Sequence, residues 1–317
     1  MLWTMTTFLN PMRYQRRLKN YETFRQHLKT PLLTVELSFD GEYQLEESDA
    51  DIMIRVPVGG LMWQKERLLN IGIDHLPAEC ESVACIDADI VFANSEWPRL
   101  AEEALSNTPI VQLNEQCLFL SENARYPDKI EIERQRISLG KWWSEQSKSD
   151  MDLNEMLWQM DGKLTWGHAI GFQKEFLENA GFFDSCIIGG GDTALLCANL
   201  GATDYCITKM QMRSPQTELY LRWAESVQAL TQRQFGYLPG TSYHLWHGSY
   251  EDRSSTNRHD ILRDAEFDAS HDIALNEHGA WVWNSEKPAL HNQVAKYFAN
   301  RREDHTPQVG SSVNSHS

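Results

Sequence analysis

The first 115 residues alternate short apolar runs with amphipathic stretches, and this pattern constrains the fold more than any other feature. Runs rich in Leu, Ile and Val predict strands at 1–9, 32–39, 51–56, 81–86 and 110–113. Apolar residues at helical spacing predict helices at 13–28, 63–71 and 99–105. Such alternation is typical of an α/β sheet with right-handed crossover connections.

The rest of the chain continues this pattern after an interruption. Residues 116–163 are rich in charged residues, Ser, Gln and Trp, so we interpret them as an insertion or mobile segment near a site. Beyond it the pattern predicts ordered structure at 164–172, a strand at 205–212 and helices at 174–179, 193–200 and 218–232. With no linker or repeat, we predict one domain over 1–300 and a disordered tail at 301–317.

Charge and cysteine content restrict the partners and the compartment. The chain has 29 Lys and Arg against 45 Asp and Glu, a formal net charge of −16. General binding to nucleic acid is therefore not expected, although a local basic groove remains open. The six cysteines include no CxxC pair, so we expect packed, reduced thiols and a cytoplasmic location. No apolar run approaches the roughly 20 residues that span a bilayer, and no signal peptide is expected.

Two carboxylates directly follow the strand predicted at 81–86, in Asp87-Ala88-Asp89. In open α/β sheets, ligands bind at the carboxyl ends of the strands. Two acids there repel each other unless a cation lies between them, and Mg²⁺ or Mn²⁺ suits carboxylate and phosphate oxygens. Taken alone, the triplet is a weak signal, and a polar turn after a strand is its commoner explanation. The Tyr-His-Leu-Trp-His-Gly segment offers His244 and His247 as further ligands or as two structural histidines.

Two glycine-rich segments precede predicted helices. In the first, Gly59-Gly60 leads to Lys65 at a helix start, where phosphate can bind, although a solvated basic face is the commoner explanation. In the second, three glycines at 189–191 precede Asp192. This acid either caps the helix at 193–200 or serves as a general base towards a hydroxyl group.

Together these segments resemble the glycosyltransferases of the A-type fold, closest to the family-2 glycosyltransferases, over about residues 3–260. The resemblance rests on the order of seven segments: 6–11, Val35-Glu36-Leu37, 59–72, 86–89, the glycine-containing segments at 167–172 and 181–192, and 244–253. It implies a Rossmann-like mixed sheet flanked by helices. A nucleotide-sugar-binding half would span 1–115, and an acceptor half would span 164–300.

The resemblance also implies residue roles around a divalent metal, Mn²⁺ or Mg²⁺. Asp89 would bind the metal and the donor diphosphate, and Asp87 would contact the metal or the ribose. His247 would be a further metal ligand, with His244 as its substitute. Asp192 would be the catalytic base. The family usually has an acidic pair after the glycines, whereas Thr follows here, so Asp184 is the alternative base.

The donor would lie against a second group of residues. By the same resemblance these are Asn10, Pro11, Glu36, Gly60 and Lys65, with the first three at the nucleotide base and ribose. The predicted activity is a hexosyltransferase that moves sugar from a nucleotide-sugar donor, most simply a UDP-sugar, to a glycan or other hydroxyl acceptor. Inversion at the anomeric carbon is expected, and retention stays open.

Three alternatives remain from the sequence. A nucleotidyltransferase that makes nucleotide sugars would share the sheet and the acidic site. Such proteins usually have a glycine- and arginine-rich loop where this chain has Leu9-Asn10-Pro11. A noncatalytic sugar- or nucleotide-binding module is the second alternative. The third concerns only the acceptor, which would be a modified base in DNA.

Overall fold

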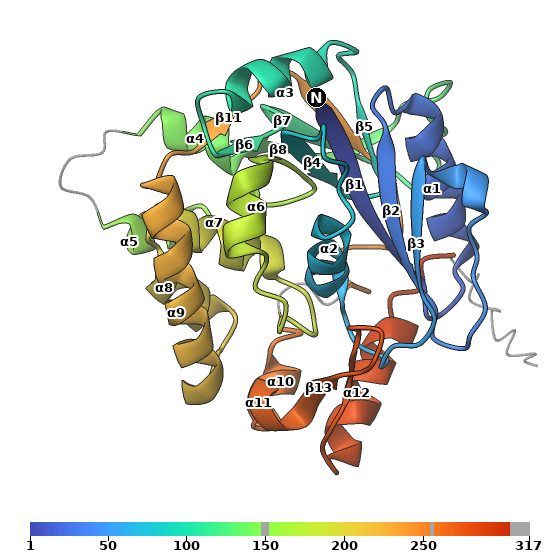
Figure 1. Ribbon diagram of the computed structural model, residues 1–317, viewed down its shortest axis with the longest axis vertical. Coiled ribbons are helices and arrows are strands. Elements are labelled where there is room, and N and C mark those ends of the chain that lie inside the picture. Colours follow the sequence, from blue (N-terminus) through green and yellow to red (C-terminus); the bar gives the residue numbers. More distant parts are fainter. Residues whose placement is uncertain (147–151, 254–256, 305–317) are drawn as a thin grey trace, which may run out of the picture.

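A seven-stranded mixed sheet lies at the centre of the structure, a computed structural model that describes residues 1–146, 152–253 and 257–304 (Figure 1). The strand order is β11-β6-β10-β4-β1-β2-β3. The strands are β1 (Leu2–Leu9), β2 (Leu32–Leu37), β3 (Ile52–Val56), β4 (Ser82–Ile86), β6 (Ile110–Gln112), β10 (Ala169–Gln173) and β11 (Gly236–Tyr237). Strands β1 to β4 pair in parallel, and β10 runs antiparallel to β4 and β6. The predicted α/β class with a Rossmann-like mixed sheet is confirmed.

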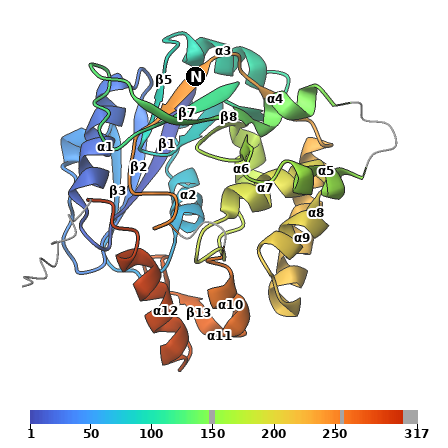
Figure 2. The same cartoon turned by 180° about the vertical axis from the view of Figure 1, so that it is seen from behind.

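Helices cover both faces of this sheet (Figure 1, and from behind in Figure 2). One face packs against α1 (Gln15–His27) and α3 (Trp97–Leu105), and the other against α2 (Lys65–Ile73) and α6 (Lys174–Ala180). Side chains of β1 alternate between the two cores. Phe8 packs with the α1 side, whereas Met5 packs with the α2 side. Burial on both faces explains why β1 reads as a continuous apolar run.

A second sheet holds part of the segment predicted to be an insertion. Its order is β5-β12-β7-β8-β9, with β5 (Ile90–Phe92), β12 (Thr241–His244), β7 (Gln116–Leu120), β8 (Ile132–Ser138) and β9 (Leu164–Thr165). Two short helices, α4 (Leu139–Ser144) and α5 (Leu153–Gln159), follow β8. Regular structure therefore occupies much of 116–163, and residues 147–151 lie outside the described residues. Strand β8 escaped detection because most of its side chains are partly or fully exposed, which weakens the apolar pattern.

The strand predicted at 205–212 is wrong. This part of the chain forms α8 (Thr203–Lys209), between α7 (Gly191–Leu200) and α9 (Ser214–Thr231). Ala202, Cys206 and Met210 are buried at a spacing of four residues, which is the period of a helix face. The buried apolar residues that suggested a strand therefore belong to one side of a helix.

The chain ends in a small layer beneath α2, with its own apolar core (Figure 1). It contains α10 (Asp260–Asp264), α11 (Ala269–Asp272), β13 (Ile273–Leu275), β14 (Trp281–Trp283) and α12 (Pro288–Ala299). Elsewhere, in the first part of the chain, a 3₁₀ turn, η1 (Glu47–Asp49), precedes β3. After α12, Arg301 and Glu303 return to the main body and are buried. The tail predicted at 301–317 therefore starts too early, and residues 305–317 lie outside the described residues.

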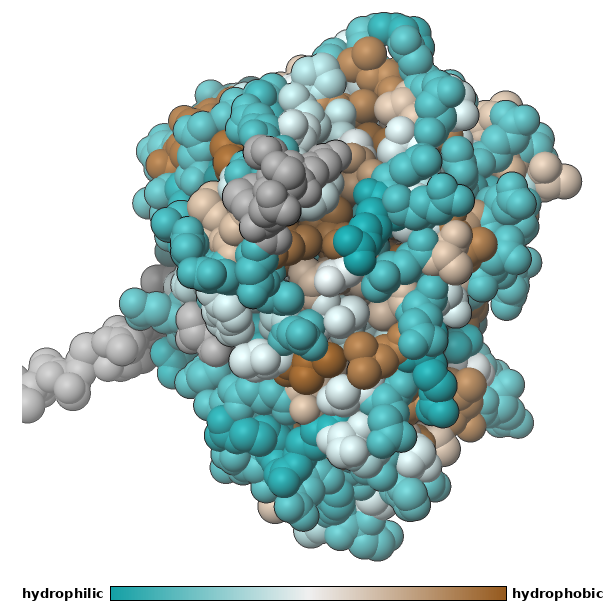
Figure 3. Space-filling view, turned by 90° about the vertical axis from the view of Figure 1, so that its left-hand side faces the viewer, coloured by the Kyte–Doolittle hydropathy of each residue, from teal (hydrophilic) through white to brown (hydrophobic). Residues whose placement is uncertain are grey.

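The face of the molecule shown in Figure 3 is mainly polar. All six cysteines are buried and free, as the sequence predicts. Within the described ranges, no helix combines the length and the apolar character needed to cross a membrane.

Candidate active site

A cavity of about 320 Å³ opens at the carboxyl ends of β1 and β4. The end of β1 contributes Leu9, and the turn after β4 contributes Asp87 and Asp89. Segments from the second half of the chain close the other sides, among them His168 before β10 and Asp192 in α7. The topology therefore brings residues far apart in sequence to the sheet edge where ligands bind in open α/β folds.

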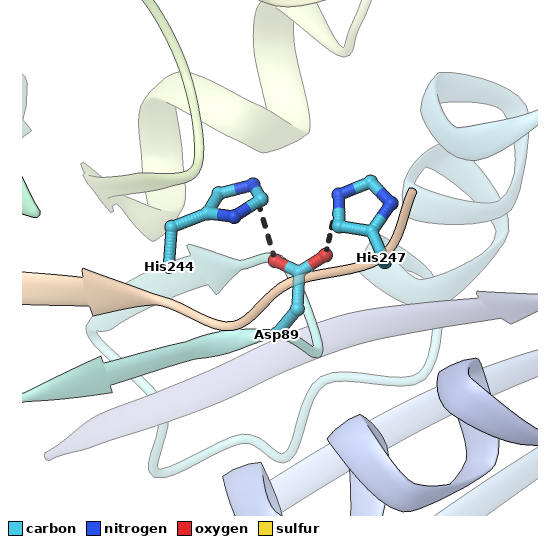
Figure 4. A group of neighbouring side chains, drawn as sticks. All are labelled: Asp89, His244 and His247. Carbon is cyan, nitrogen blue, oxygen red and sulfur yellow. Dashed lines mark ion pairs between the residues drawn. The ribbon is translucent and has the colours of Figure 1, made fainter. Parts of the chain in front are cut away.

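One carboxylate and two imidazoles meet in this cavity (Figure 4). His247 Nε2 lies 3.3 Å from Asp89 Oδ2, and His244 Nε2 lies 3.9 Å from Asp89 Oδ1. The two chain segments are joined by strand pairing, because His244 is opposite Ile90 and the Leu245 N–H donates to the Asp89 carbonyl at 2.8 Å. The structure thus unites Asp89 with both candidate histidines.

The electrostatics of this triad fit a divalent cation. Burial, with a further contribution from neighbouring Asp87, raises the pKa of Asp89 to about 7. Burial and the nearby Arg253 together lower the pKa of His247 to about 3, and burial holds the pKa of His244 well below its usual range. Neutral imidazole is the ligating form of histidine. Asp89 Oδ1 is buried and has no hydrogen-bond partner among the described residues, so this oxygen is available as a ligand atom.

A hydrogen bond now occupies one of the candidate ligand atoms. Arg253 Nη1 donates to His247 Nε2 at 2.9 Å. A cation taken up by that nitrogen would have to replace this contact. Two nitrogen donors and one carboxylate suit a transition-metal ion such as Mn²⁺ better than Mg²⁺, which prefers oxygen.

A fully buried carboxylate lies behind His247. Glu303 Oε1 is 3.6 Å from His247 Nδ1, and Glu303 also pairs with Arg17 and Arg301, both at 2.5 Å. Carboxylates in this position commonly orient a ligating imidazole. Sequence reasoning missed Glu303 because its partners are far away along the chain and its own surroundings are polar.

Asp87 lies outside the triad and binds a lysine instead. Lys65 Nζ is 2.6 Å from Asp87 Oδ1 and 3.1 Å from Asp192 Oδ1. Although burial alone would lower the pKa of Lys65, Asp192 and Asp87 hold it well above its usual range. The ammonium group therefore links two cavity carboxylates, and phosphate binding, the role predicted for Lys65, would compete with these ion pairs.

Asp192 is positioned by its neighbours rather than by helix capping. The N-cap of α7 is Gly190, at φ +105°, and the helix begins at Gly191. Asp192 lies in the first turn, a third exposed, with its carboxylate on Lys65. A Cβ on Gly167 would collide with the Asp192 carboxylate, so a side chain at position 167 would displace it. The capping interpretation of Asp192 is therefore wrong.

The alternative base is placed elsewhere. Asp184 does not line the cavity in the described structure, and its Oδ2 accepts from Arg67 at 3.0 Å and from Asn70 at 2.9 Å. These contacts hold the loop before α7 against α2.

Four residues predicted to hold the donor also lie off the cavity lining, within the described ranges: Asn10, Pro11, Glu36 and Gly60. Asn10 bonds Tyr14 and Gln44, while Glu36 Oε1 accepts the Gln44 N–H at 2.6 Å. Gly60 packs against β14 and donates to the Trp281 carbonyl at 2.7 Å. Their contacts lie within local loops, so these residues do not face a ligand in the cavity as the structure stands.

His168 lines the cavity and is among the residues there for which the sequence predicts no role. His168 has φ +76°, which is strained for a residue with a side chain, and its ring packs against His244 with centroids 4.9 Å apart. Its Nδ1 is buried without a hydrogen-bond partner among the described residues. Burial lowers its pKa. The only sequence signal was its place in the Gly167-to-Phe172 segment.

No protein-family model and no curated protein matches the chain. Solved structures do match. Glucosyl-3-phosphoglycerate synthase from Mycobacterium tuberculosis, with Mn²⁺, UDP and phosphoglyceric acid, is 8% identical over 84% of this chain and 76% of that chain, with a TM-score of 0.40. The catalytic domain of Drosophila beta1,4-galactosyltransferase 7, with xylobiose, is 10% identical over 91% and 98%, at 0.38.

A third match has a different name. It is 4-diphosphocytidyl-2C-methyl-D-erythritol synthase from Anaerococcus prevotii, 11% identical over 76% of this chain and 87% of that chain, with a TM-score of 0.31. With TM-scores of 0.40 or less, these matches carry no argument about substrate or reaction.

Proposed function

We propose that the protein is a metal-dependent glycosyltransferase that moves a hexosyl group from a UDP-sugar to an acceptor hydroxyl, with inversion. One observation carries the proposal. The Asp89–His244–His247 triad and the Asp192 carboxylate open into the same cavity at the carboxyl ends of β1 and β4. A cation site for a diphosphate and a nearby proton acceptor are the two requirements of this reaction.

The three triad residues would hold Mn²⁺. When bound, this ion would neutralise the diphosphate and so favour its departure as a leaving group. Glu303 would keep His247 turned towards Asp89, since it lies on the opposite side of the imidazole.

Asp192 would accept the proton of the attacking hydroxyl. Its carboxylate is a third exposed and borders the cavity, so a substrate can reach it. The Lys65 ammonium pairs with Asp192 Oδ1 at 3.1 Å and so holds the carboxylate in place. Because Lys65 also binds Asp87, it fixes Asp192 relative to the turn that carries Asp89.

The test measures product from a panel of nucleotide sugars, with Mn²⁺, with Mg²⁺ and with EDTA. A glycosyltransferase releases nucleoside diphosphate, and Mn²⁺ should support the reaction better than Mg²⁺. The acceptor panel includes simple glycosides and DNA with hydroxymethylated bases. UDP release that is abolished in Asp89→Asn and kept in the exposed variant Glu277→Gln would support the proposal.

The same assay separates the alternatives. A nucleotidyltransferase would release pyrophosphate from a nucleoside triphosphate and a sugar phosphate. A binding module would bind UDP with Mn²⁺ in a calorimetric titration and release no product from any donor. Metal-independent UDP release would contradict the triad assignment.

A further inference from the structure

Two arginines on β8 extend over aromatic rings at the cavity. Arg134 and Arg136 are two residues apart, so they lie on the same face of the strand. Their guanidinium carbons are 4.5 and 5.6 Å from the ring centroid of Tyr250. The same carbons are 5.8 and 5.6 Å from the centroid of Phe119. All four residues line the cavity.

This pair has little charge compensation. In the described part of the chain, the ion pair of Arg134 is with Glu133 at 3.8 Å, and Arg136 has none. Arg136 Nε is buried without a hydrogen-bond partner among the described residues. A guanidinium that stacks on rings keeps its N–H edge available to a planar or tetrahedral anion. Leaving such donors buried and unpaired is unfavourable, so the arrangement favours an anionic ligand.

The charge of the whole cavity also favours an anionic ligand. The chain carries a net charge of −16, yet the described lining residues include eight Lys and Arg against five Asp and Glu. Positive charge is therefore concentrated where substrates would enter.

We propose that Arg134 and Arg136 bind a phosphate monoester on the acceptor substrate. Two guanidinium groups match the two negative charges of a phosphate monoester. This inference rests on the proposed function, because it assigns the acceptor class for the same cavity. The pair belongs to the second sheet rather than to the turn after β4, and Phe119 links it to the triad, with its ring 4.9 Å from that of His244. That position fits a second substrate group beside the donor diphosphate.

The test is a calorimetric titration with methyl phosphate. UDP and Mn²⁺ are present, so that the diphosphate and cation positions are filled. We expect Arg136→Gln and Arg134→Gln each to weaken methyl phosphate binding at least tenfold, and Arg136→Lys to weaken it less. The matched control is Arg99→Gln, an exposed arginine on α3, and it should bind as the wild type does. The affinity for UDP with Mn²⁺ should change less than twofold.

Several results would overturn the proposal. Equal methyl phosphate binding by the wild type and the Arg134/Arg136 double variant would show that the pair holds no anion. Loss of UDP affinity in these variants would assign the pair to the donor diphosphate. Tighter binding of acetate than of methyl phosphate would make the group a carboxylate. If the wild type binds no UDP, the proposed function fails, and the methyl phosphate titration alone still decides whether the pair is an anion site.

Discussion

We predict that the ion pairs of Glu303 are among the main electrostatic contacts between residues 301–304 and the rest of the protein. Its side chain is fully buried, and it pairs with Arg17 and Arg301, of which Arg301 is 4% exposed. Burial alone would raise the pKa of Glu303, but the two arginines hold it well below its usual range. Glu303→Ala would leave the buried Arg301 and the partly buried Arg17 without their carboxylate. Removing one partner of a buried pair costs about 3–5 kcal/mol, and we expect a loss of this size in the free energy of unfolding.

Urea unfolding followed by circular dichroism measures this loss. Glu303→Gln keeps the shape and one acceptor, so we expect a smaller loss, of about 1.5–3 kcal/mol. Glu277, which is 87% exposed, supplies the control, and Glu277→Ala should change stability by less than about 0.5 kcal/mol. A Glu303→Ala protein within about 1 kcal/mol of the wild type would refute the reasoning. We also expect Mn²⁺ affinity to fall about 10- to 100-fold in folded Glu303→Gln, because His247 loses its orienting partner.

Three further predictions concern the cavity. Asp192→Asn should transfer sugar about 10²–10⁴ times more slowly in a UDP-release assay and bind UDP normally, whereas an unchanged rate would exclude Asp192 as the base. Gly167→Ala should reduce the rate without changing Mn²⁺ affinity, because the new Cβ displaces the Asp192 carboxylate; wild-type turnover would contradict this. Lys65→Met should lower the free energy of unfolding, measured in urea, by about 1–2 kcal/mol. This loss is smaller than the value for a fully buried pair because Asp87 and Asp192 are partly exposed. No change in stability would show that the two carboxylates need no cation.

Local sequence patterns predicted the central sheet and most of its helices well. The apolar run of β1 and the helical spacing of α1 are signals carried by neighbouring residues, and both elements appear within two residues of their expected bounds. Asp89 and His247 could be singled out because an acidic residue after a buried strand and a histidine pair are themselves local patterns. Their meeting depends on the pairing of β5 with β12, which joins segments about 150 residues apart.

The parts that could not be predicted depend on long-range contacts. Glu303 forms an ion pair with Arg17, which lies on α1. The polar sequence around Glu303 does not indicate this pairing, because its partner is 286 residues away along the chain. Lys65 looked like a phosphate ligand because its neighbours at the helix start fit that role, whereas the fold places two carboxylates on it. Glu36 was expected at the nucleotide, but the loop ahead of η1 folds back and uses its carboxylate.

The measurement that tests the central claim most directly is a crystal structure of the protein with UDP and Mn²⁺, recorded where manganese scatters anomalously. We expect one strong anomalous peak within bonding distance of Asp89, His244 and His247, with the diphosphate on the cavity side of the ion. The same crystals of Asp89→Asn should show no peak at that position. Manganese bound elsewhere in the wild type, or UDP bound away from this triad, would contradict the account.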